Sequence, residues 1–445
     1  MFDKLIPHIR HANYYLTVLG SVDRLYKSGG DSMMEGLVIY DRDEANIRRG
    51  VFWTSNSFEE NDVVADLAIR FVDYSAHIAN IRMPRNEWIK WLSIATTAAR
   101  QLGYRKYEGM LLGNSGMAYY DMGEYSRAIE HYLQSLAIFR EVGFKEGEGA
   151  ELGNIGNVYY SLGEYPNAIN YHEQHLAIAS DIGDLRSEGK ALGNLGNAYY
   201  CLGDYPRALS YHNQHREIAE KSGDLLDEGN ALGNIGNIYY DMADYHRAIS
   251  YHKQHLALAK KIGNRRGEGN ALGNIGNAYY RLGEYSLAME YHSQHYAIAT
   301  ESEDIQGVGN AIGNLGNVYY SLGEYHRAIE LYKRNHEIAV QIGYRRGEGN
   351  ALGNIGNAYQ ALGEYSQAIN YLMQQLAITK EIGDRPGENN ALRNLANTYR
   401  CMKEYNTAIK YYSLQRLLSG EIGDLQAKDE AENCISLCYR ALSSE

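Results

Sequence analysis

The chain has 445 residues and a formal net charge of −12, which limits the classes of protein to which it can belong. An acidic chain binds nucleic acid poorly, because the phosphate backbone attracts basic surfaces. No apolar stretch approaches the roughly 18 residues that a membrane span needs, and the first residues lack the layout of a signal peptide. We therefore expect a cytoplasmic protein without nucleic-acid or membrane partners, and the composition leaves its oligomeric state open.

Residues 1–67 form an N-terminal region that precedes the regular part of the chain. It contains the phrase Gly36–Arg48, followed by Trp53. This phrase resembles the helical segment that joins an NB-ARC-type nucleotide switch to its repeats in large bacterial signalling proteins, which implies a helical region. The chain is not the nucleotide-binding half itself, because it has no glycine-rich loop that ends in Lys followed by Ser or Thr.

Residues 68–107 are interpreted as a degenerate leading copy of a unit that repeats every 40 residues through 108–427. Three of its residues stand 40 positions before residues that mark the first regular copy: Trp88, Leu92 and Gly103 precede Ala128, Tyr132 and Gly143. At the other end, residues 428–445 keep the apolar positions of the unit and lose its polar ones. We expect a C-terminal capping helix there.

Residues 108–427 contain eight copies of the unit. A period of this length indicates a solenoid, because each unit can bury its apolar face only against its neighbours. In the fifth copy, Leu272, Ile275 and Tyr279 fall on one face of a first helix, which Gly283 ends. A second helix follows, and its apolar face carries five residues: Tyr285, Ala288, His292, His295 and Ala299. Each unit is therefore predicted to be a helix, a turn and a second helix.

The residues Ile275-Gly276, Tyr279, Gly283, Tyr285 and Ala288 together resemble the tetratricopeptide repeat. The 40-residue length and phrases such as Leu315–Tyr319 and Tyr251–Ala257 are similar to Pins-type adaptors and to kinesin light chain. The resemblance implies an all-α, right-handed superhelix of helix pairs, which we expect to lie between the helical N-terminal region and the capping helix. It also implies that the first helices line a concave groove that binds peptides.

Two glycines recur inside each first helix, as Gly273 and Gly276 do in the fifth copy. Each costs roughly 0.5–1 kcal/mol relative to alanine, so each needs a packing reason. We expect Gly276 to allow close approach of the second helix near Ala288. Gly273 points toward the polar face, where nothing in its own unit is predicted to contact it, and we expect it to leave space for a ligand.

A stripe of asparagines on the polar face of the first helices is the main candidate binding site. Its members are Asn114, Asn154, Asn157, Asn194, Asn197, Asn234, Asn237, Asn274, Asn277, Asn314, Asn317, Asn354, Asn357, Asn394 and Asn397. A carboxamide offers an acceptor and two donors, which match the C=O and N–H groups of an extended peptide of any sequence. The alternative is that neighbouring copies bond their asparagines to each other. We favour peptide binding, because the Gly273-type positions leave space beside the stripe.

Tyrosines extend the stripe, at Tyr240, Tyr280 and Tyr320 among others. Such tyrosines either recognise a ligand or pack against the next unit. The last copies differ, because Arg400 replaces this tyrosine and Arg393 replaces a glycine. Arginine pairs carboxylates through two N–H groups, so we expect both arginines to take an acidic side chain or the terminal carboxylate of a bound peptide.

Histidine pairs spaced three residues apart recur in the second helices: His172/His175, His212/His215, His252/His255 and His292/His295. A metal could bridge such a pair, but every pair lies on the apolar face, so we expect packing residues and no metal. The cysteines are Cys201, Cys401, Cys434 and Cys438. They are too widely spread for a disulfide framework, so we expect them to be reduced and buried.

No nucleophile elbow, metalloprotease motif or comparable catalytic signature occurs, so we expect neither an enzyme nor a cofactor. The array instead predicts a protein–protein interaction scaffold, which holds an extended peptide or a flexible partner segment in a groove lined by asparagine. Two alternatives stay open. One is a sensor arm of a nucleotide-switch or protease signalling system, and the other is a receptor for a short signalling peptide.

Overall fold

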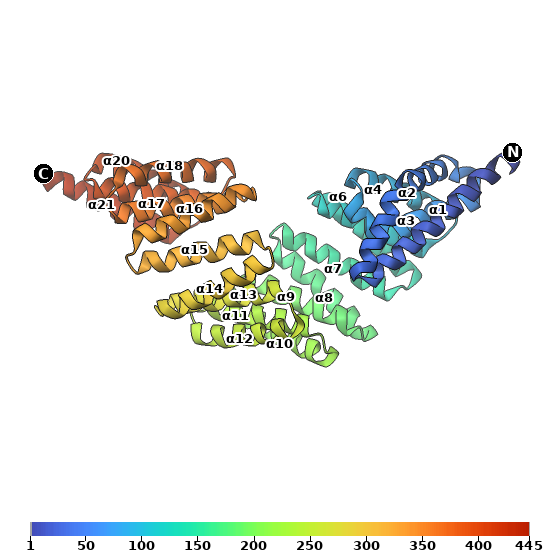
Figure 1. Cartoon of the computed structure of the whole chain (residues 1–445), viewed down its shortest axis with the longest axis horizontal. Helices are drawn as coiled ribbons and strands as arrows, with labels where there is room; N and C mark the ends of the chain where they lie inside the picture. The colour runs from blue at the N-terminus through green and yellow to red at the C-terminus, as the bar shows by residue number, and fades with distance from the viewer. Residues whose placement is uncertain (1, 445) are drawn as a thin grey trace. The chain divides into compact units, whose positions relative to one another are not determined.

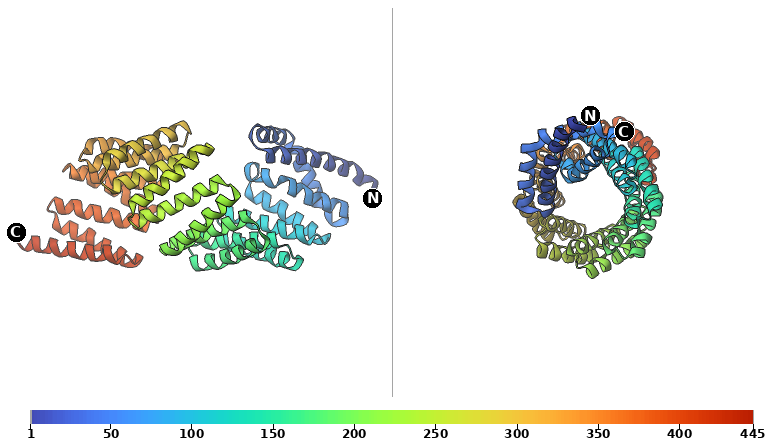
Figure 2. Two further views of the ribbon diagram at one scale, coloured as in Figure 1. Left: turned by 90° about the horizontal axis from the view of Figure 1, so that it is seen from below. Right: turned by 90° about the vertical axis from the view of Figure 1, so that its right-hand side faces the viewer.

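The computed structural model describes residues 2–444, and every regular element within that range is helical. The predicted all-α fold is therefore confirmed. The chain divides into two compact units, Met1–Gly223 and Asp224–Glu445. Within each unit, every helix packs against the next helix along the chain, as Figures 1 and 2 show from three directions.

The helices of the first unit are α1 (Phe2–Ser28), α2 (Gly30–Ser57), the short 3-10 helix η1 (Phe58–Glu60), α3 (Asp62–Arg82), α4 (Arg85–Gln101), α5 (Arg105–Asp121), α6 (Tyr125–Val142), α7 (Lys145–Ser161), α8 (Tyr165–Ile182), α9 (Leu185–Cys201) and α10 (Tyr205–Ser222). Helices α1 to α4 share one apolar core, in which Tyr40, Phe71 and Leu92 are fully buried. The regular helix pairs begin with α5 and α6.

The helices of the second unit are α11 (Leu225–Asp241), α12 (Tyr245–Ile262), α13 (Arg265–Arg281), α14 (Tyr285–Glu301), α15 (Ile305–Ser321), α16 (Tyr325–Gln341), α17 (Arg345–Ala361), α18 (Tyr365–Glu381), α19 (Arg385–Cys401), α20 (Tyr405–Ile422) and α21 (Leu425–Ser444). From α5 to α20, odd numbers are first helices and even numbers are second helices. Helix α21 packs against α20 at the end of the array. No helix in residues 2–444 is both long and apolar enough to cross a bilayer.

From α4 onward, each turn between helices contains one residue in the left-handed backbone region. Gly283 joins α13 to α14 with a φ of 79°, and Gly263 ends α12 with a φ of 70°. Glycine adopts this conformation at little cost because it has no Cβ. Three turns carry a side chain instead: Ala243, Glu303 and Lys403 have φ values of 60°, 55° and 63°. These three turns are strained relative to their glycine counterparts.

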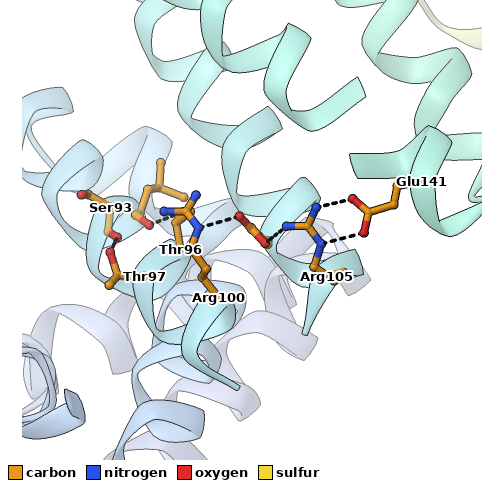
Figure 3. A network of polar contacts seen from close by, with 8 residues as sticks. Ser93, Thr96, Thr97, Arg100, Arg105 and Glu141 are labelled. Carbon is orange, nitrogen blue, oxygen red and sulfur yellow. Dashed lines mark hydrogen bonds and ion pairs between the residues drawn. The ribbon is translucent and has the colours of Figure 1, made fainter. Parts of the chain in front are cut away.

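An ion-pair network ties the start of a first helix to the end of its second helix. Arg105 in α5 pairs with Glu108 in the same helix and with Glu141 in α6, and Figure 3 shows its guanidinium group directed at the Glu141 carboxylate. Arg100 in α4 donates to Glu108 at 2.8 Å. Glu108 is only 2% exposed, so two arginines from different helices compensate its burial. The same arrangement within a helix pair recurs in α13 with α14 and in α17 with α18.

The recurring glycines make room for buried side chains of the second helix. A Cβ added at Gly276 would lie 2.5 Å from Cε1 of His292, so an imidazole ring, and not Ala288, occupies the space beside it. A Cβ added at Gly273 would lie 3.0 Å from Nδ1 of His295. The expectation that Gly273 contacts nothing in its own unit is therefore wrong. Both glycines let the first helix lie directly against a histidine of its partner helix.

This packing predicts opposite effects for two glycine substitutions. Gly276→Ala places a methyl group against the His292 ring and should lower the free energy of unfolding by about 1–3 kcal/mol. Gly420→Ala is the matched control, because Gly420 is helical and has no heavy atom within 4 Å of an added Cβ. It should raise stability by up to about 1 kcal/mol through helix propensity. Urea midpoints measure both, and shifts in the same direction would contradict the packing described.

Candidate functional site

All fifteen asparagines of the predicted stripe lie on first helices and are half-buried, so their amides border solvent. Several of them are bonded within the protein. Asn194 donates to Asn157 at 3.1 Å, and Asn274 donates to Asn237 at 3.2 Å, in each case across two successive repeats. Asn154 donates to the carboxyl of Glu151 at 3.2 Å. For these residues the contacts support the structural alternative, in which neighbouring copies bond their asparagines.

Two further asparagines accept a hydrogen bond from a tyrosine of their own second helix. The Tyr332 hydroxyl donates to Asn317 at 2.8 Å, and the Tyr412 hydroxyl donates to Asn397 at 2.6 Å. Asn197 and Asn234 also take part in interactions within the protein. These side chains are therefore partly committed to the array itself.

Five asparagines of the second unit differ, and we call them the open stripe: Asn277, Asn314, Asn354, Asn357 and Asn394. Within residues 2–444, no hydrogen bond reaches their side chains. They lie on four consecutive first helices, α13, α15, α17 and α19. In the first unit, Asn114 is likewise without a side-chain partner among the described residues. The unsatisfied amides of the predicted site are thus concentrated in the second unit.

The open stripe borders a pocket of about 330 Å³ formed by α17, α18 and α19. Its lining residues are Asn350, Gly353, Asn354, Asn357, Gln375, Asn390, Arg393 and Asn394. The pocket therefore brings together four residues that the sequence predicted, and three polar residues that it missed. Asn350 and Asn390 occupy one repeated position and could have been found from the period. Gln375 could not be found in this way, because the second to fifth copies carry a histidine at the equivalent position.

Two side chains give the pocket its polarity. Arg393 is half-buried and donates from Nη2 to Oδ1 of Asn390 at 3.1 Å. Gln375 is 5% exposed, and its buried Oε1 atom has no hydrogen-bond partner among the described residues. A Cβ added at Gly353 would lie 2.6 Å from Nε2 of Gln375, so the glycine is needed to admit this amide. No carboxylate lines the pocket.

Arg400, the second arginine that the sequence predicted to bind a carboxylate, does not line this pocket. Arg400 is exposed and lies beside Tyr412 and Cys434, toward the capping helix. Only Arg393 of the two arginines lines the pocket. The two therefore do not form one carboxylate-binding pair there.

The tyrosines of the stripe contact other residues of the array, either in the next repeat or in their own. The hydroxyls of Tyr280 and Ser321 are joined by a 2.8 Å hydrogen bond. Tyr240 and Tyr320 contact tyrosine rings at the start of their own second helices, with ring centroids 5.4 and 5.3 Å apart. These contacts favour the packing interpretation over direct recognition.

The histidine pairs serve as packing residues, as the sequence indicated. His172, His212, His252 and His292 are each 1% exposed. Burial, with a smaller contribution from the neighbouring histidine, lowers the pKa of each to about 4. Among the described residues, no cluster of three or more histidine, cysteine or acidic side chains could hold a metal ion.

The expectation that the four cysteines are buried holds for one of them. Cys201 and Cys401 are exposed, and Cys434 is half-buried, so only Cys438 is buried as predicted. The Cys201 thiol lies 3.2 Å from the Tyr160 hydroxyl of the preceding repeat. Cys201 therefore takes part in a polar contact between the first helices of two successive repeats, and the sequence pattern within one first helix does not reveal this.

A family model described as tetratricopeptide repeat matches residues 107–181, 148–221, 227–301, 307–381 and 349–414. Two solved structures show a similar fold over most of their own length. The apo quorum sensor NprR from B. thuringiensis has a TM-score of 0.55 at 16% identity, over 75% of this chain and 97% of that one. Aspartyl phosphate phosphatase F from Bacillus subtilis has a TM-score of 0.53 at 15% identity, over 83% of this chain and 94% of that one.

A third structure is only partly covered. It is the signal transduction ATPase with numerous domains from Pyrococcus horikoshii, which has a tetratricopeptide repeat sensor. Its TM-score is 0.57 at 17% identity. The match covers 82% of this chain and 55% of that one. At these identities the likeness concerns the fold alone. No curated protein matches the sequence.

The buried histidines predict a loss of stability in acid. A histidine with a folded-state pKa near 4 binds fewer protons than its unfolded counterpart between pH 4 and about 6.5, so the free energy of unfolding falls as the pH drops through this window. Each such residue should cost about 2 kcal/mol at pH 5 relative to pH 8.

The variant His292→Tyr, which installs the residue that the sixth copy carries as Tyr332, should reduce this acid loss. His246→Gln is the matched control, because His246 is exposed. Urea midpoints at pH 8 and pH 5 report the difference. An unchanged pH dependence in His292→Tyr, or an equal change in the control, would show that burial of His292 does not cause it.

Proposed function

This chain belongs to the tetratricopeptide repeat family, and we propose that it is a scaffold that binds an extended peptide segment of a partner protein on the open stripe. Repeats of this family bind proteins and peptides, which agrees with that role. The family match identifies a repeat module and no catalytic family, and we assign the chain no catalytic role. We place its action in the cytoplasm.

The free amides of the open stripe support the proposal. Asn354 and Asn357 lie one helical turn apart on α17, and Asn394 continues the surface on α19. Each carboxamide can accept one backbone N–H and donate to one backbone C=O. Because these side chains are half-buried and make no hydrogen bond within the described protein, a peptide can bond to them without breaking an existing contact.

The neutrality of the surface agrees with binding through the peptide backbone. Seven of the eight residues that line the pocket are amides or glycine, and Arg393 is the charged one. Amides recognise the backbone of an extended chain whatever its side chains are, so the surface suits a flexible segment of a partner. The alternatives from the sequence, a sensor arm and a receptor for a signalling peptide, would use the same surface and differ in the response that binding triggers.

The hydrogen bonds decide which asparagines test the proposal. Asn237 and Asn274 belong to the predicted stripe but are bonded to each other, so they do not test it. Replacing Asn354 and Asn357 by alanine should instead weaken binding strongly, because each ligand amide left unpaired costs about 1–3 kcal/mol. The measurement is the amount of peptide that the purified chain retains from a pool of random octapeptides, read by mass spectrometry.

The matched control is Asn237→Ala with Asn274→Ala. This variant removes one bond between repeats, so it should lower the urea midpoint and retain as much peptide as the wild type. Circular dichroism checks that both variants keep their helix content. A folded Asn354/Asn357 variant that retains as much peptide as the wild type would refute binding at the open stripe.

A further inference from the structure

Two departures from the repeat pattern meet where the first copy packs against the second, between α5, α6 and α7. Ser135 of α6 stands where the second to fifth copies carry a buried histidine, such as His175. Glu151 of α7 stands where the next six copies carry a buried alanine, such as Ala191. A Cβ added at Gly113 of α5 would overlap Oε1 of Glu151. The carboxyl therefore fills space beside the glycine that an imidazole ring fills in the second to fifth copies.

The Glu151 carboxyl is buried without a basic partner. Glu151 is 5% exposed, and it forms no ion pair with any residue in the described range 2–444. Glu148, which lies one turn earlier on the same helix, pairs with both Arg140 and Lys145. A buried carboxylate without a positive partner is unfavourable, so this environment favours the neutral, protonated form of Glu151.

The titratable groups that face Glu151 leave its protonation state to burial and hydrogen bonding. Helices α5, α6, α8 and α9 pack against α7, and among their described residues only Tyr132 of α6 interacts electrostatically with Glu151. Burial raises the pKa of Tyr132, so its hydroxyl is neutral at pH 7. Burial lowers the pKa of His172 and of His175 on α8, and the positive charge near His175 is Lys190 of α9. Helix α5 contributes a glycine to this contact.

The hydrogen bonds around Glu151 fit the protonated acid. The Ser135 hydroxyl lies 2.8 Å from the carbonyl oxygen of Gly109 and 3.0 Å from Oε1 of Glu151, but it has one hydrogen to donate. If Glu151 is protonated, its O–H donates to Ser135, and Ser135 donates to Gly109. Asn154 donates to Oε2 at 3.2 Å, so both oxygens of the acid are bonded. If Glu151 is ionised, either its Oε1 or the Gly109 carbonyl loses the bond to the serine.

We propose that the Glu151 carboxyl is a proton-binding site that makes the junction of the first two copies sensitive to pH: the protonated acid holds α6 against α7, and ionisation weakens this contact. Burial raises the pKa of Glu151 from its usual 4.5 to about 7, and the hydrogen bonds from Asn154 and Ser135 lower it by less. Between these two values the closed junction binds more protons than the opened one. The stability that the proton contributes is therefore complete below pH 4.5 and is lost as the pH rises through 7.

The test compares the full chain with its Glu151→Gln variant. The amide of this variant reproduces the hydrogen bonds of the neutral acid, because Nε2 donates to Ser135 and Oε1 accepts from Asn154. Hydrogen exchange of the α6 and α7 amides, read by mass spectrometry, reports opening of the junction. From pH 5 to pH 8 the ratio of wild-type to variant exchange rates should rise about 50-fold, because the closed junction releases its proton over this range. Taking the ratio at each pH removes the opposite effect of the buried histidines.

A second variant keeps the test decisive if glutamine packs poorly. Glu151→Ala with Ser135→His installs the alanine and histidine found at the equivalent positions of the following copies, so it fills the space without a carboxyl. Its exchange should match that of Glu151→Gln in pH dependence. The matched control is Glu146→Gln on the same helix, where the glutamate is exposed, and it should behave as the wild type does. A ratio that stays constant from pH 5 to pH 8 for both Glu151 variants, or an equal change in the control, would overturn the proposal.

Discussion

The contact between a glycine of the first helix and a bulky side chain of the second helix determines how each repeat is built. At Gly276 the His292 ring lies directly against the backbone, and any Cβ would overlap it. Elsewhere the bulky partner is Tyr332 or Leu372, so the requirement is for volume and not for imidazole chemistry. The close approach turns the opposite face of the first helix outward. That face carries the asparagines.

The identity of the bulky residue also affects the binding face. The tyrosine Tyr332 reaches beyond the glycine that its ring contacts, Gly316. Its hydroxyl then donates a hydrogen bond to Asn317 of the first helix. A histidine or leucine ends in the core and leaves the asparagine of its repeat to other partners. Core packing and surface chemistry are therefore coupled in the sixth and eighth copies, through Tyr332 and Tyr412. Replacing Tyr332 by histidine or leucine would remove the hydrogen bond that Asn317 accepts.

The sequence predicts the helices and turns well because their signals are local and are repeated in every copy. The positions of Gly263 and Gly283, and the apolar face of Ile275, each follow from neighbours within one turn of the chain. It does not predict which asparagines pair, because Asn194 and Asn157 meet across two repeats and their distance depends on how the helices stack. The contact at Gly273 is hidden from the sequence for a related reason, because the side chain that fills its space belongs to the partner helix.

The strained turns at Ala243, Glu303 and Lys403 have a consequence for how the array opens. In a linear stack each repeat is stabilised only by its neighbours, so unfolding starts where the local free energy is lowest and spreads from there. A side chain held in the left-handed region stores strain that a glycine would not. Among the described residues, all three of these side chains lie in turns of the second unit, so this strain is confined to that unit. Local opening at the Glu303 turn would part α14 from α15, so the asparagines of α15 would lose their position relative to the preceding repeat while the rest of the unit stays folded.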